Sequence, residues 1–355
     1  MSIPLHNVNA VRYRFTVWRN GAPLVYGGRA VELEPYGAGT LTHDNGAELQ
    51  DSIQQTFLDY RPLGVDFVRD ILRVECDING QTFPLGRFCV TTERPGMSGG
   101  VRTVEIEGYS LLWILTQCKL EAIRTWSAGT AYTEVIAGLL TEAGFTEYEI
   151  EASSAVLATD RADWDIGTEF LEIINDLLGE INYNPIFADF SGVIRATKYR
   201  APTISGVTHS YTEGRDSVIR ADYDSELDRF GVANVFIVIC DSPEFETALR
   251  AEAVNADPAS PYSTVSLGRR VPHIERVDNT PNQAALQDTA DRLRSESMQT
   301  SERIEITTAP QPDHEANETL LVQVGELAGV YRETGFEFDL SPGGQMKHRA
   351  VRVIV

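Results

Sequence analysis

The sequence is poor in the features by which several classes of protein are recognised. Its 355 residues include four cysteines, Cys76, Cys89, Cys118 and Cys240, and none of them forms a CxxC pair. Each lies in or beside an apolar run, so we expect buried, reduced thiols and no disulfide framework. No run approaches the roughly 18 apolar residues of a membrane-spanning helix, and the first residues do not resemble a signal peptide. We therefore expect synthesis in a cytoplasm and no membrane insertion by this chain.

Basic residues are also few. The chain has 30 Lys and Arg against 52 Asp and Glu, a formal net charge of −22. A negative net charge is the wrong sign for a protein that binds nucleic acid. The excess is greatest between Thr141 and Asp189, where twelve carboxylates accompany one basic residue, Arg161. Composition alone leaves two interpretations open: a solvated acidic surface, or a surface that must not hold polyanions.

Motifs for catalysis are nearly absent. The segment GMSGG at 96–100 matches the G-x-S-x-G pattern of hydrolases, in which a strand precedes the serine and a helix follows it. Here the next residues have a strand pattern, so we interpret Ser98 as part of a flexible loop between strands. A glycosidase pair among Asp160, Asp163 and Asp165 is uninformative, because acidic residues are abundant here. No glycine-rich phosphate-binding motif occurs, and we assign no catalytic residue and no cofactor.

Metal-binding patterns are missing as well. The six histidines occur singly, without H-x-x-x-H or H-E-x-x-H spacing. They are His6, His43, His209, His273, His314 and His348. Four carboxylates, Asp222, Asp224, Glu226 and Asp228, occupy alternate positions without the central glycine of a calcium loop. We interpret them as a row of charges on one face of a strand and predict no metal site.

Residues 1–124 are expected to form a first β domain. Apolar residues of segment 11–17 alternate with Arg12, Arg14 and Thr16, which is typical of a strand with one buried face. A similar alternation over 72–78 leads into Asn79-Gly80, a dipeptide that favours a hairpin turn. Strands and turns at this spacing predict a sandwich or a barrel. The segment GYSLLWILTQC at 108–118 predicts a short buried helix that closes the domain.

Residues 125–203 are expected to form a small α+β insert. Apolar residues over 135–143 have helical spacing, and Gly144 predicts the end of that helix. Thr168 is the expected N-cap of a second helix, which ends at Gly179. The sequence PIFADFSGVIRATKY then predicts a hairpin that turns at 189–192.

A β pattern returns in residues 204–355, the expected second β domain. The apolar run NVFIVIC at 234–240 is typical of a strand covered on both faces. Thr280, Pro281 and Gln283 predict the capped start of a helix over 281–299. The polar, proline-bearing segment 241–272 is expected to be an exposed excursion. The predicted fold class is β-rich α+β, with the α+β module inserted between two β domains.

Three segments, taken in order, resemble the baseplate hub proteins of phage tails and contractile injection systems. They are GTAYTEVIAGLLTEAGF at 129–145, WDIGTEFLEIINDLLGEINYNPIFADFSGVIRATKY at 164–199 and RFGVANVFIVIC at 229–240. The helix with ALQDTADRLRSES and the strands RIEIT, TLLVQV and FEFDL complete the same order of elements over residues 5–355. No single motif is specific, and the resemblance lies in the ordered set.

The resemblance implies two tube-type β-barrel domains in one chain and a homotrimeric, pseudo-sixfold ring. Such a ring mates with the tail tube or a distal tail protein above and a spike or fibre protein below, with the tape measure protein as a further neighbour. It implies a place in the virion, at the tail tip or baseplate, and a non-enzymatic role. Many relatives carry a C-terminal cell-wall hydrolase, and because this sequence ends at VRVIV we expect no lytic role.

In such a ring the barrels line a channel for DNA ejection. An acidic lining repels phosphates, so DNA is expected to pass without specific binding. Glu75, Asp77, Glu337 and Asp339 alternate with apolar neighbours and are the candidate lining residues. The equal alternative is that these four carboxylates face outer solvent.

Two functions from other classes stay open. One is a β-rich glycoside hydrolase or esterase of a tail, using the acidic cluster or Ser98. The other is an adhesion module for host carbohydrate, with Trp18, Trp113, Trp126 and Trp164 as stacking platforms. Because these tryptophans lie among apolar neighbours or beside expected element starts, we expect them to pack inside the protein.

Overall fold

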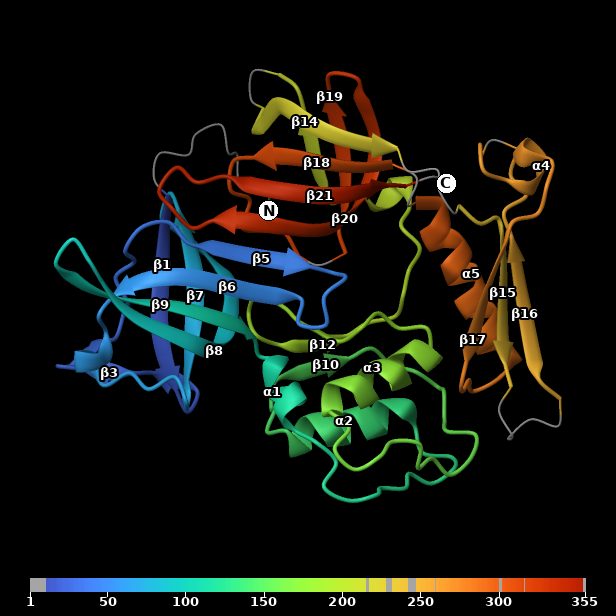
Figure 1. Ribbon diagram of the computed structural model, residues 1–355, viewed down its shortest axis with the longest axis horizontal. Helices are drawn as coiled ribbons and strands as arrows, with labels where there is room; N and C mark the ends of the chain where they lie inside the picture. Colours follow the sequence, from blue (N-terminus) through green and yellow to red (C-terminus); the bar gives the residue numbers. More distant parts are fainter. Residues whose placement is uncertain are drawn as a thin grey trace.

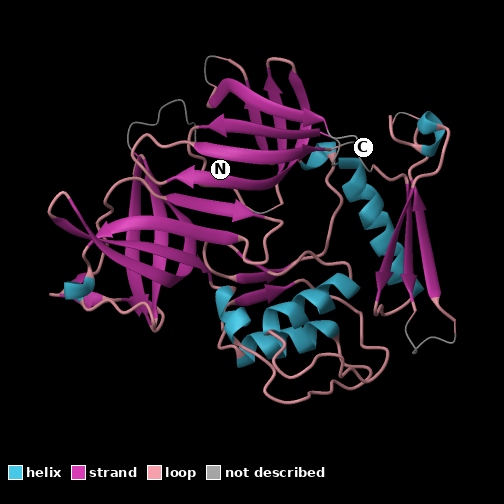
Figure 2. Ribbon diagram, viewed as in Figure 1, coloured by secondary structure: helices cyan, strands magenta, loops and turns pink. Residues whose placement is uncertain are grey.

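The computed structural model describes residues 11–214, 217–227, 232–241, 247–258, 260–299, 302–315 and 317–353. It is dominated by strands and has few helices, so the expected β-rich α+β class is confirmed (Figures 1 and 2). Figure 1 shows a large sheet with strands from both ends of the chain, a group of helices α1–α3 below it, and a small sheet beside α5. Within the described ranges, no helix combines the length and apolar character needed to cross a membrane.

The large sheet has 13 strands from the two ends of the chain. Its N-terminal strands are β1 (Val11–Arg19), β2 (Ala22–Pro23), β5 (Thr40–Asp44), β6 (Asp51–Leu58), β7 (Asp70–Ile78), β8 (Gln81–Ser98) and β9 (Val101–Ser110). Its C-terminal strands are β13 (His209–Thr212), β14 (Ile219–Leu227), β18 (Glu302–Thr308), β19 (Thr319–Val324), β20 (Leu327–Asp339) and β21 (Met346–Arg352). Eleven of the strands follow the order β14-β18-β21-β20-β5-β6-β9-β8-β7-β1-β2. In addition, β19 pairs with β20, and β13 pairs with β19. A ribbon of β3 (Val25–Tyr26) and β4 (Arg29–Ala30) and a 3-10 turn, η2 (Arg61–Leu63), lie in connections.

Strand β20 belongs to both halves of this sheet. Along one edge, residues 327–332 pair with β19 and residues 335–339 pair with β5, while β21 occupies the opposite edge. The alternation predicted for this strand is confirmed, since Phe336 and Phe338 are fully buried. The two halves therefore share a backbone ladder and not merely a side-chain contact.

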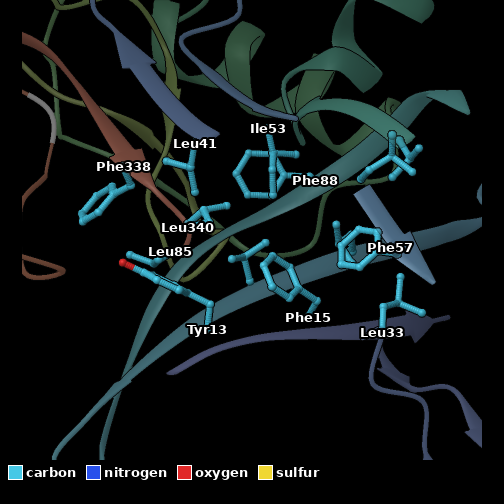
Figure 3. Close-up of a cluster of buried hydrophobic side chains, with 14 of the residues drawn as sticks. Tyr13, Phe15, Leu33, Leu41, Ile53, Phe57, Leu85, Phe88, Phe338 and Leu340 are labelled. Carbon is cyan, nitrogen blue, oxygen red and sulfur yellow. The ribbon is translucent and has the colours of Figure 1, made fainter. Parts of the chain in front are cut away.

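The N-terminal half encloses one large apolar core. Figure 3 shows Tyr13, Phe15, Phe57 and Phe88 in this core together with Phe338 from β20. Burying an aromatic or aliphatic side chain of this size stabilises a fold by roughly 1.5–3 kcal/mol. The C-terminal strand is thus part of the hydrophobic core of the N-terminal half.

The extended segment 31–36 connects the two ends of the strand series β6-β9-β8-β7-β1. On one side the amide of Leu33 donates to the carbonyl of Phe15 in β1, at 2.8 Å. On the other side the amide of Tyr36 donates to the carbonyl of Thr56 in β6, also at 2.8 Å. Main-chain hydrogen bonds therefore run from β1 through this segment to β6.

Helices and short strands follow β9, as the sequence predicted for this part of the chain. They are α1 (Trp113–Gln117), which precedes the expected insert, and α2 (Tyr132–Glu142), β10 (Tyr148–Ile150), α3 (Phe170–Glu180), β11 (Phe187–Ala188) and β12 (Ile194–Ala196), which lie within 125–203. The hairpin expected at 189–192 is confirmed, because the amide of Gly192 donates to the carbonyl of Asp189 between β11 and β12. The expected helix near 108–118 also exists, but its buried Leu112 and Leu115 join the core of α2 and α3 and not that of the first β domain.

The predicted start of α3 is wrong by one residue. Glu169 is the N-terminal boundary residue, and no side chain caps the helix. The backbone explains this shift, since Lys119 and Glu169 form a β-bridge and the amide of Phe170 donates to the carbonyl of Cys118. Extended pairing thus continues past Thr168, which removes it from the capping position.

A second small sheet corrects the expectation for residues 204–299. The region contains η3 (Ile204–Gly206), β15 (Val235–Cys240), β16 (Leu249–Val254), α4 (Thr264–Leu267), β17 (Pro272–Val277) and α5 (Gln283–Gln299). Strand β15 is central in the order β16-β15-β17 and does not join the large sheet. The exposed excursion predicted at 241–272 is wrong for β16, which has buried positions, whereas α4 has no buried residue. Residues 242–246 and 259 lie outside the described part of the chain.

Small residues explain why this module was missed. The buried positions of β16 are Ala251 and Ala253, which pack with Leu286 and Ala290 of α5, and alanine is a weak strand signal. The helix predicted over 281–299 is confirmed, but its cap is not Thr280. The side-chain oxygen of Asn282 accepts from the amides of the two residues after Gln283, at 2.9 and 3.1 Å.

The cysteine prediction is confirmed for three of the four thiols. Cys76, Cys89 and Cys240 are buried, whereas Cys118 is partly exposed. Burial raises the pKa of Cys76 and of Cys89 to about 12, so both stay protonated at neutral pH.

Candidate functional site

Glu337 and Asp339, two of the predicted lining residues, lie side by side on β20. Their side chains point away from the core that holds Phe336 and Phe338. With Glu105 of β9 and Lys347 of β21 they line an open hollow over β6, β5, β20 and β21. This hollow lies on five adjacent strands, β9, β6, β5, β20 and β21, and has many polar side chains in its lining.

Glu75 and Asp77, the other two, lie on β7, with four strands between them and β20. Arg14 of β1 lies 2.9 Å from the Glu75 carboxylate and 2.8 Å from that of Asp77, and Arg73 lies 2.9 Å from Glu75. These two carboxylates are largely neutralised by arginines. The structure therefore groups the four candidates into two separate pairs with different charge environments.

The serine of the hydrolase-like motif lies at the tip of a hairpin. Ser98 is the last residue of β8 and pairs with Val101, the first residue of β9. Gly99 and Gly100 form the turn between them, with φ of 57° and 83°, a region that glycine adopts without strain. The strand-to-strand loop predicted here is confirmed, and the strand–turn–helix geometry of a nucleophile elbow is not formed.

The acidic residues around Arg161 make structural contacts. Arg161 is buried and makes two hydrogen bonds of 2.9 Å to the Glu180 carboxylate, and it also pairs with Asp163. Asp160 accepts from the amide of Ala128 at 2.8 Å. Asp165 is exposed. Asp160 and Asp163, two of the three carboxylates considered for a glycosidase pair, thus hold loops of the α+β module together.

The tryptophans show a similar pattern. Trp164 is buried, donates from its indole to Asp176 at 2.9 Å and meets Trp126 edge-on. The guanidinium of Arg73 lies over the ring of Trp18, 5.0 Å from its centre. Trp164 is therefore packed as expected, and Trp18, Trp113 and Trp126 are half-buried.

A buried histidine network lies where the halves of the large sheet meet, and the sequence analysis did not find it. Four histidines contribute: His43 on β5, His209 on β13, His314 in the β18–β19 connection and His348 on β21. Three of them, His43, His314 and His348, lie around Glu333 of β20, and His209 pairs with Glu318 at 3.1 Å. One signal was available, since His348 has the same strand phase as the buried residues 346 and 350.

Glu333 holds the centre of this network. Its two carboxylate oxygens lie 2.9 Å from Nδ1 of His314 and 2.6 Å from Nδ1 of His348. The outer nitrogens are also engaged, because Nε2 of His314 meets the Tyr211 hydroxyl and Nε2 of His348 lies 2.8 Å from the Thr308 hydroxyl. All atoms of this group are buried.

Charges couple strongly in this setting. Burial alone favours a neutral imidazole, but the carboxylates of Glu333 and Glu318 raise the pKa of His314 to about 9. Burial opposes ionisation of Glu333, yet His314 and His348 lower its pKa to about 2. Burial and the neighbouring His314 lower the pKa of His348. The network thus holds a charged pair, Glu333 and His314, beside a neutral His348.

The row of alternate carboxylates lies on β14, an edge strand. Asp222, Asp224 and Glu226 are exposed there, as a solvated charge row requires, and Asp228 lies outside the described residues. Exposed charges at a sheet edge disfavour unwanted strand pairing.

The fold has been seen before, although the sequence has diverged: no protein-family model and no curated protein sequence matches it. A tail protein from Neisseria meningitidis MC58 is 16% identical with a TM-score of 0.67, covering 96% of this chain and 97% of that chain. The 43 kDa tail protein of prophage MuSo2 from Shewanella oneidensis is 14% identical with a TM-score of 0.64, covering 95% and 98%.

A more distant match is a component of the type VI secretion system of E. coli that exhibits structural similarity to tail proteins of bacteriophage T4. It is 11% identical with a TM-score of 0.52, and the match covers 91% of this chain and 74% of that chain. At these identities the likeness is one of fold. It confirms, at that level, the resemblance to tail and injection-system proteins.

Proposed function

We propose that this chain is a structural hub subunit of a phage tail tip or baseplate and works as a homotrimeric, pseudo-sixfold ring. The observation that carries the proposal is the likeness of fold to tail proteins over 95–96% of the chain. A trimer presents six tube-type domains only if each chain supplies two. In the ring, the tail tube or a distal tail protein lies above, a spike or fibre protein lies below, and the tape measure protein is a further neighbour in the virion.

Two features support a pair of tube-type β-barrels in each chain. Segment 31–36 links β1 to β6, which is the connection that closure of the N-terminal half needs. In the C-terminal half, six strands form the series β13-β19-β20-β21-β18-β14, in which β13 and β14 are the two ends. The domain boundaries we propose remain 1–124, 125–203 and 204–355, with β15–β17 and α5 as a decoration of the last.

The assembled particle provides the test of this function. A cryo-electron microscopy map at domain resolution should place three copies of this chain in one ring around the tail axis. A sixfold ring of this chain, or a position in a peripheral fibre, would contradict the hub proposal.

We further propose that Glu337 and Asp339 line the channel through which DNA leaves. The support is their position in an open polar hollow on adjacent strands. Glu75 and Asp77 stay candidates for the lining, but the arginines beside them leave little net charge to repel phosphate. DNA then passes without specific binding, because like charges provide no adhesive site.

Charge reversal tests the lining. The double variant Glu337→Lys with Asp339→Lys should assemble normally but eject DNA several-fold more slowly, because lysines attract the passing phosphates. The matched control is Glu121→Lys with Asp165→Lys, two exposed residues outside the large sheet. Ejection from purified particles, followed by a DNA-binding dye, should be normal in the control. Normal ejection in the first variant, with intact particles, would retire the lining proposal and leave the hub proposal standing.

A further inference from the structure

The histidine network at the junction of the two half-sheets brings two carboxylates to one imidazole nitrogen. Nδ1 of His314 lies 2.9 Å from an oxygen of Glu333 and 3.0 Å from Oε2 of Glu318. One ring nitrogen carries at most one proton, so it can serve only one of the two carboxylates. Oε2 of Glu318 also lies 3.1 Å from Nε2 of His209, and it is buried without a hydrogen bond of good geometry.

The group is also shielded from water. His314, His348 and Glu333 are each at most 1% exposed. His209 pairs with Glu318 beside them, and its ring stacks on that of His314 with centroids 3.8 Å apart. Buried imidazole and carboxylate groups at such spacing are the ligands by which proteins hold zinc-type ions.

We infer that His314, His348 and Glu333 bind a divalent transition-metal ion of the zinc type, with Glu318 as the fourth ligand. One ligand atom from each of the first three residues lies within 4.8 Å of the others. Their nitrogen–oxygen separations are 2.6 and 2.9 Å. Bonds of about 2.0–2.2 Å to a tetrahedral ion place ligand atoms about 3.4 Å apart, so these separations must open by about 0.5–0.8 Å. The ion is then shared by all four ligands.

The donor set selects the class of metal. Two imidazoles with carboxylates suit zinc and its first-row neighbours, whereas magnesium and calcium prefer oxygen ligands alone. The outer nitrogen of each ring is already held, by the hydroxyl of Tyr211 for His314 and by that of Thr308 for His348. Such contacts fix the ring orientation in protein metal sites. His209 stays outside the ligand set, because a ring stacked on His314 would have to tilt to reach the same ion.

The position of the site indicates what the ion does. Its ligands come from the β18–β19 connection, from β20 and from β21, and β20 is the strand that both half-sheets share. A bound ion therefore fastens the connection to the junction and is structural. This inference does not depend on the proposed hub function.

Zinc binding to the untagged, full-length chain tests the site. After dialysis against EDTA, the protein should take up one equivalent of Zn²⁺, and its thermal midpoint should rise by about 5 °C or more. Mg²⁺ and Ca²⁺ should not raise it. Co²⁺ in place of Zn²⁺ should give the intense visible bands of a tetrahedral site. Uptake of less than about a tenth of an equivalent would overturn the proposal.

Variants locate the ion. Glu318→Gln is nearly isosteric and should bind Zn²⁺ about 10–100-fold more weakly, while His348→Gln should not bind it at all. The control is His273→Asn, which changes an exposed histidine of β17 and should bind like the wild type. Circular dichroism checks that each variant folds. If His348→Gln does not fold, Glu318→Gln and the Co²⁺ spectrum decide, and wild-type affinity in Glu318→Gln without tetrahedral Co²⁺ bands contradicts the site.

Discussion

At the scale of single residues, buried charges here are held by specific partners. Asp70, at the start of β7, has a fully buried side chain and lies 2.5 Å from Nε of Arg19 on β1. It also accepts from the amide of Asp66 at 2.7 Å. Burial raises the pKa of Asp70, but the hydrogen bonds from Arg19 and Asp66 outweigh it and the pKa falls below its usual value. The carboxylate therefore stabilises the fold only while it is ionised.

The variant Asp70→Asn should lower the free energy of unfolding by about 2 kcal/mol at pH 7, because it leaves Arg19 without its charged partner. A group whose pKa is lowered by folding contributes stability above its unfolded pKa and loses it as the pH falls through the folded value. The difference from the wild type should therefore shrink below about pH 4. Urea unfolding at pH 7 and pH 3 measures both values.

The control for this variant is Glu32→Gln. Glu32 pairs with Arg12 at the surface, where both side chains are well exposed, so its loss should cost less than about 0.5 kcal/mol. A difference for Asp70→Asn that is the same at both pH values would contradict the electrostatic account.

At the scale of elements, β20 depends on one glycine. Pairing with β21 shifts register between Glu333 and Gly335, where β20 also passes close to β5. A Cβ on Gly335 would lie 2.5 Å from the carbonyl oxygen of His43 and 3.3 Å from Cα of Asp44. Both obstacles are backbone atoms and cannot move without disturbing the ladder.

Gly335→Ala should therefore destabilise the protein by about 2 kcal/mol or more, as overpacking does in a tight site. The matched control is Gly138→Ala in α2, where a Cβ meets nothing within 4 Å. That substitution should stabilise the protein by about 0.5–1 kcal/mol, because alanine is the better helix former. Thermal unfolding compares the two, and wild-type stability in Gly335→Ala would contradict the close approach.

At the scale of the whole molecule, the two ends of the chain complete one another. The core of the N-terminal half includes Phe336, Phe338, Leu340 and Met346 from the C-terminal strands. Without them β5 has an unpaired edge and the core has a large gap. The N-terminal half is thus not expected to reach its native state alone.

A fragment of residues 1–203 should be compact but should bind a hydrophobic dye and unfold without a cooperative transition. A peptide of residues 317–355, carrying β20 and β21, should restore cooperative unfolding. The same peptide with Phe336→Ala and Phe338→Ala should bind at least about 100-fold more weakly, since each lost ring removes several kcal/mol. Cooperative unfolding of the fragment alone would show that the halves are independent.

Much of the local structure follows from the sequence by itself. The strand alternations, the α+β module with its hairpin at 189–192 and the helix over 281–299 could be predicted, because period-2 and helical patterns and turn residues act over a few positions. The loop position of Ser98 follows in the same way. Net charge and the lack of catalytic motifs are also properties of the chain alone.

Only the tertiary structure decided which distant strands meet. Pairing of β20 with β5 joins residues almost 300 positions apart, and no local pattern specifies such a partner. The histidine network depends on that pairing, since His43, His314 and His348 come from separate elements around Glu333. The same holds for β16, whose buried alanines become strand positions only because α5 covers them. Side-chain periodicity determines which face of an element is buried, whereas the partner of that face is determined by the shared core.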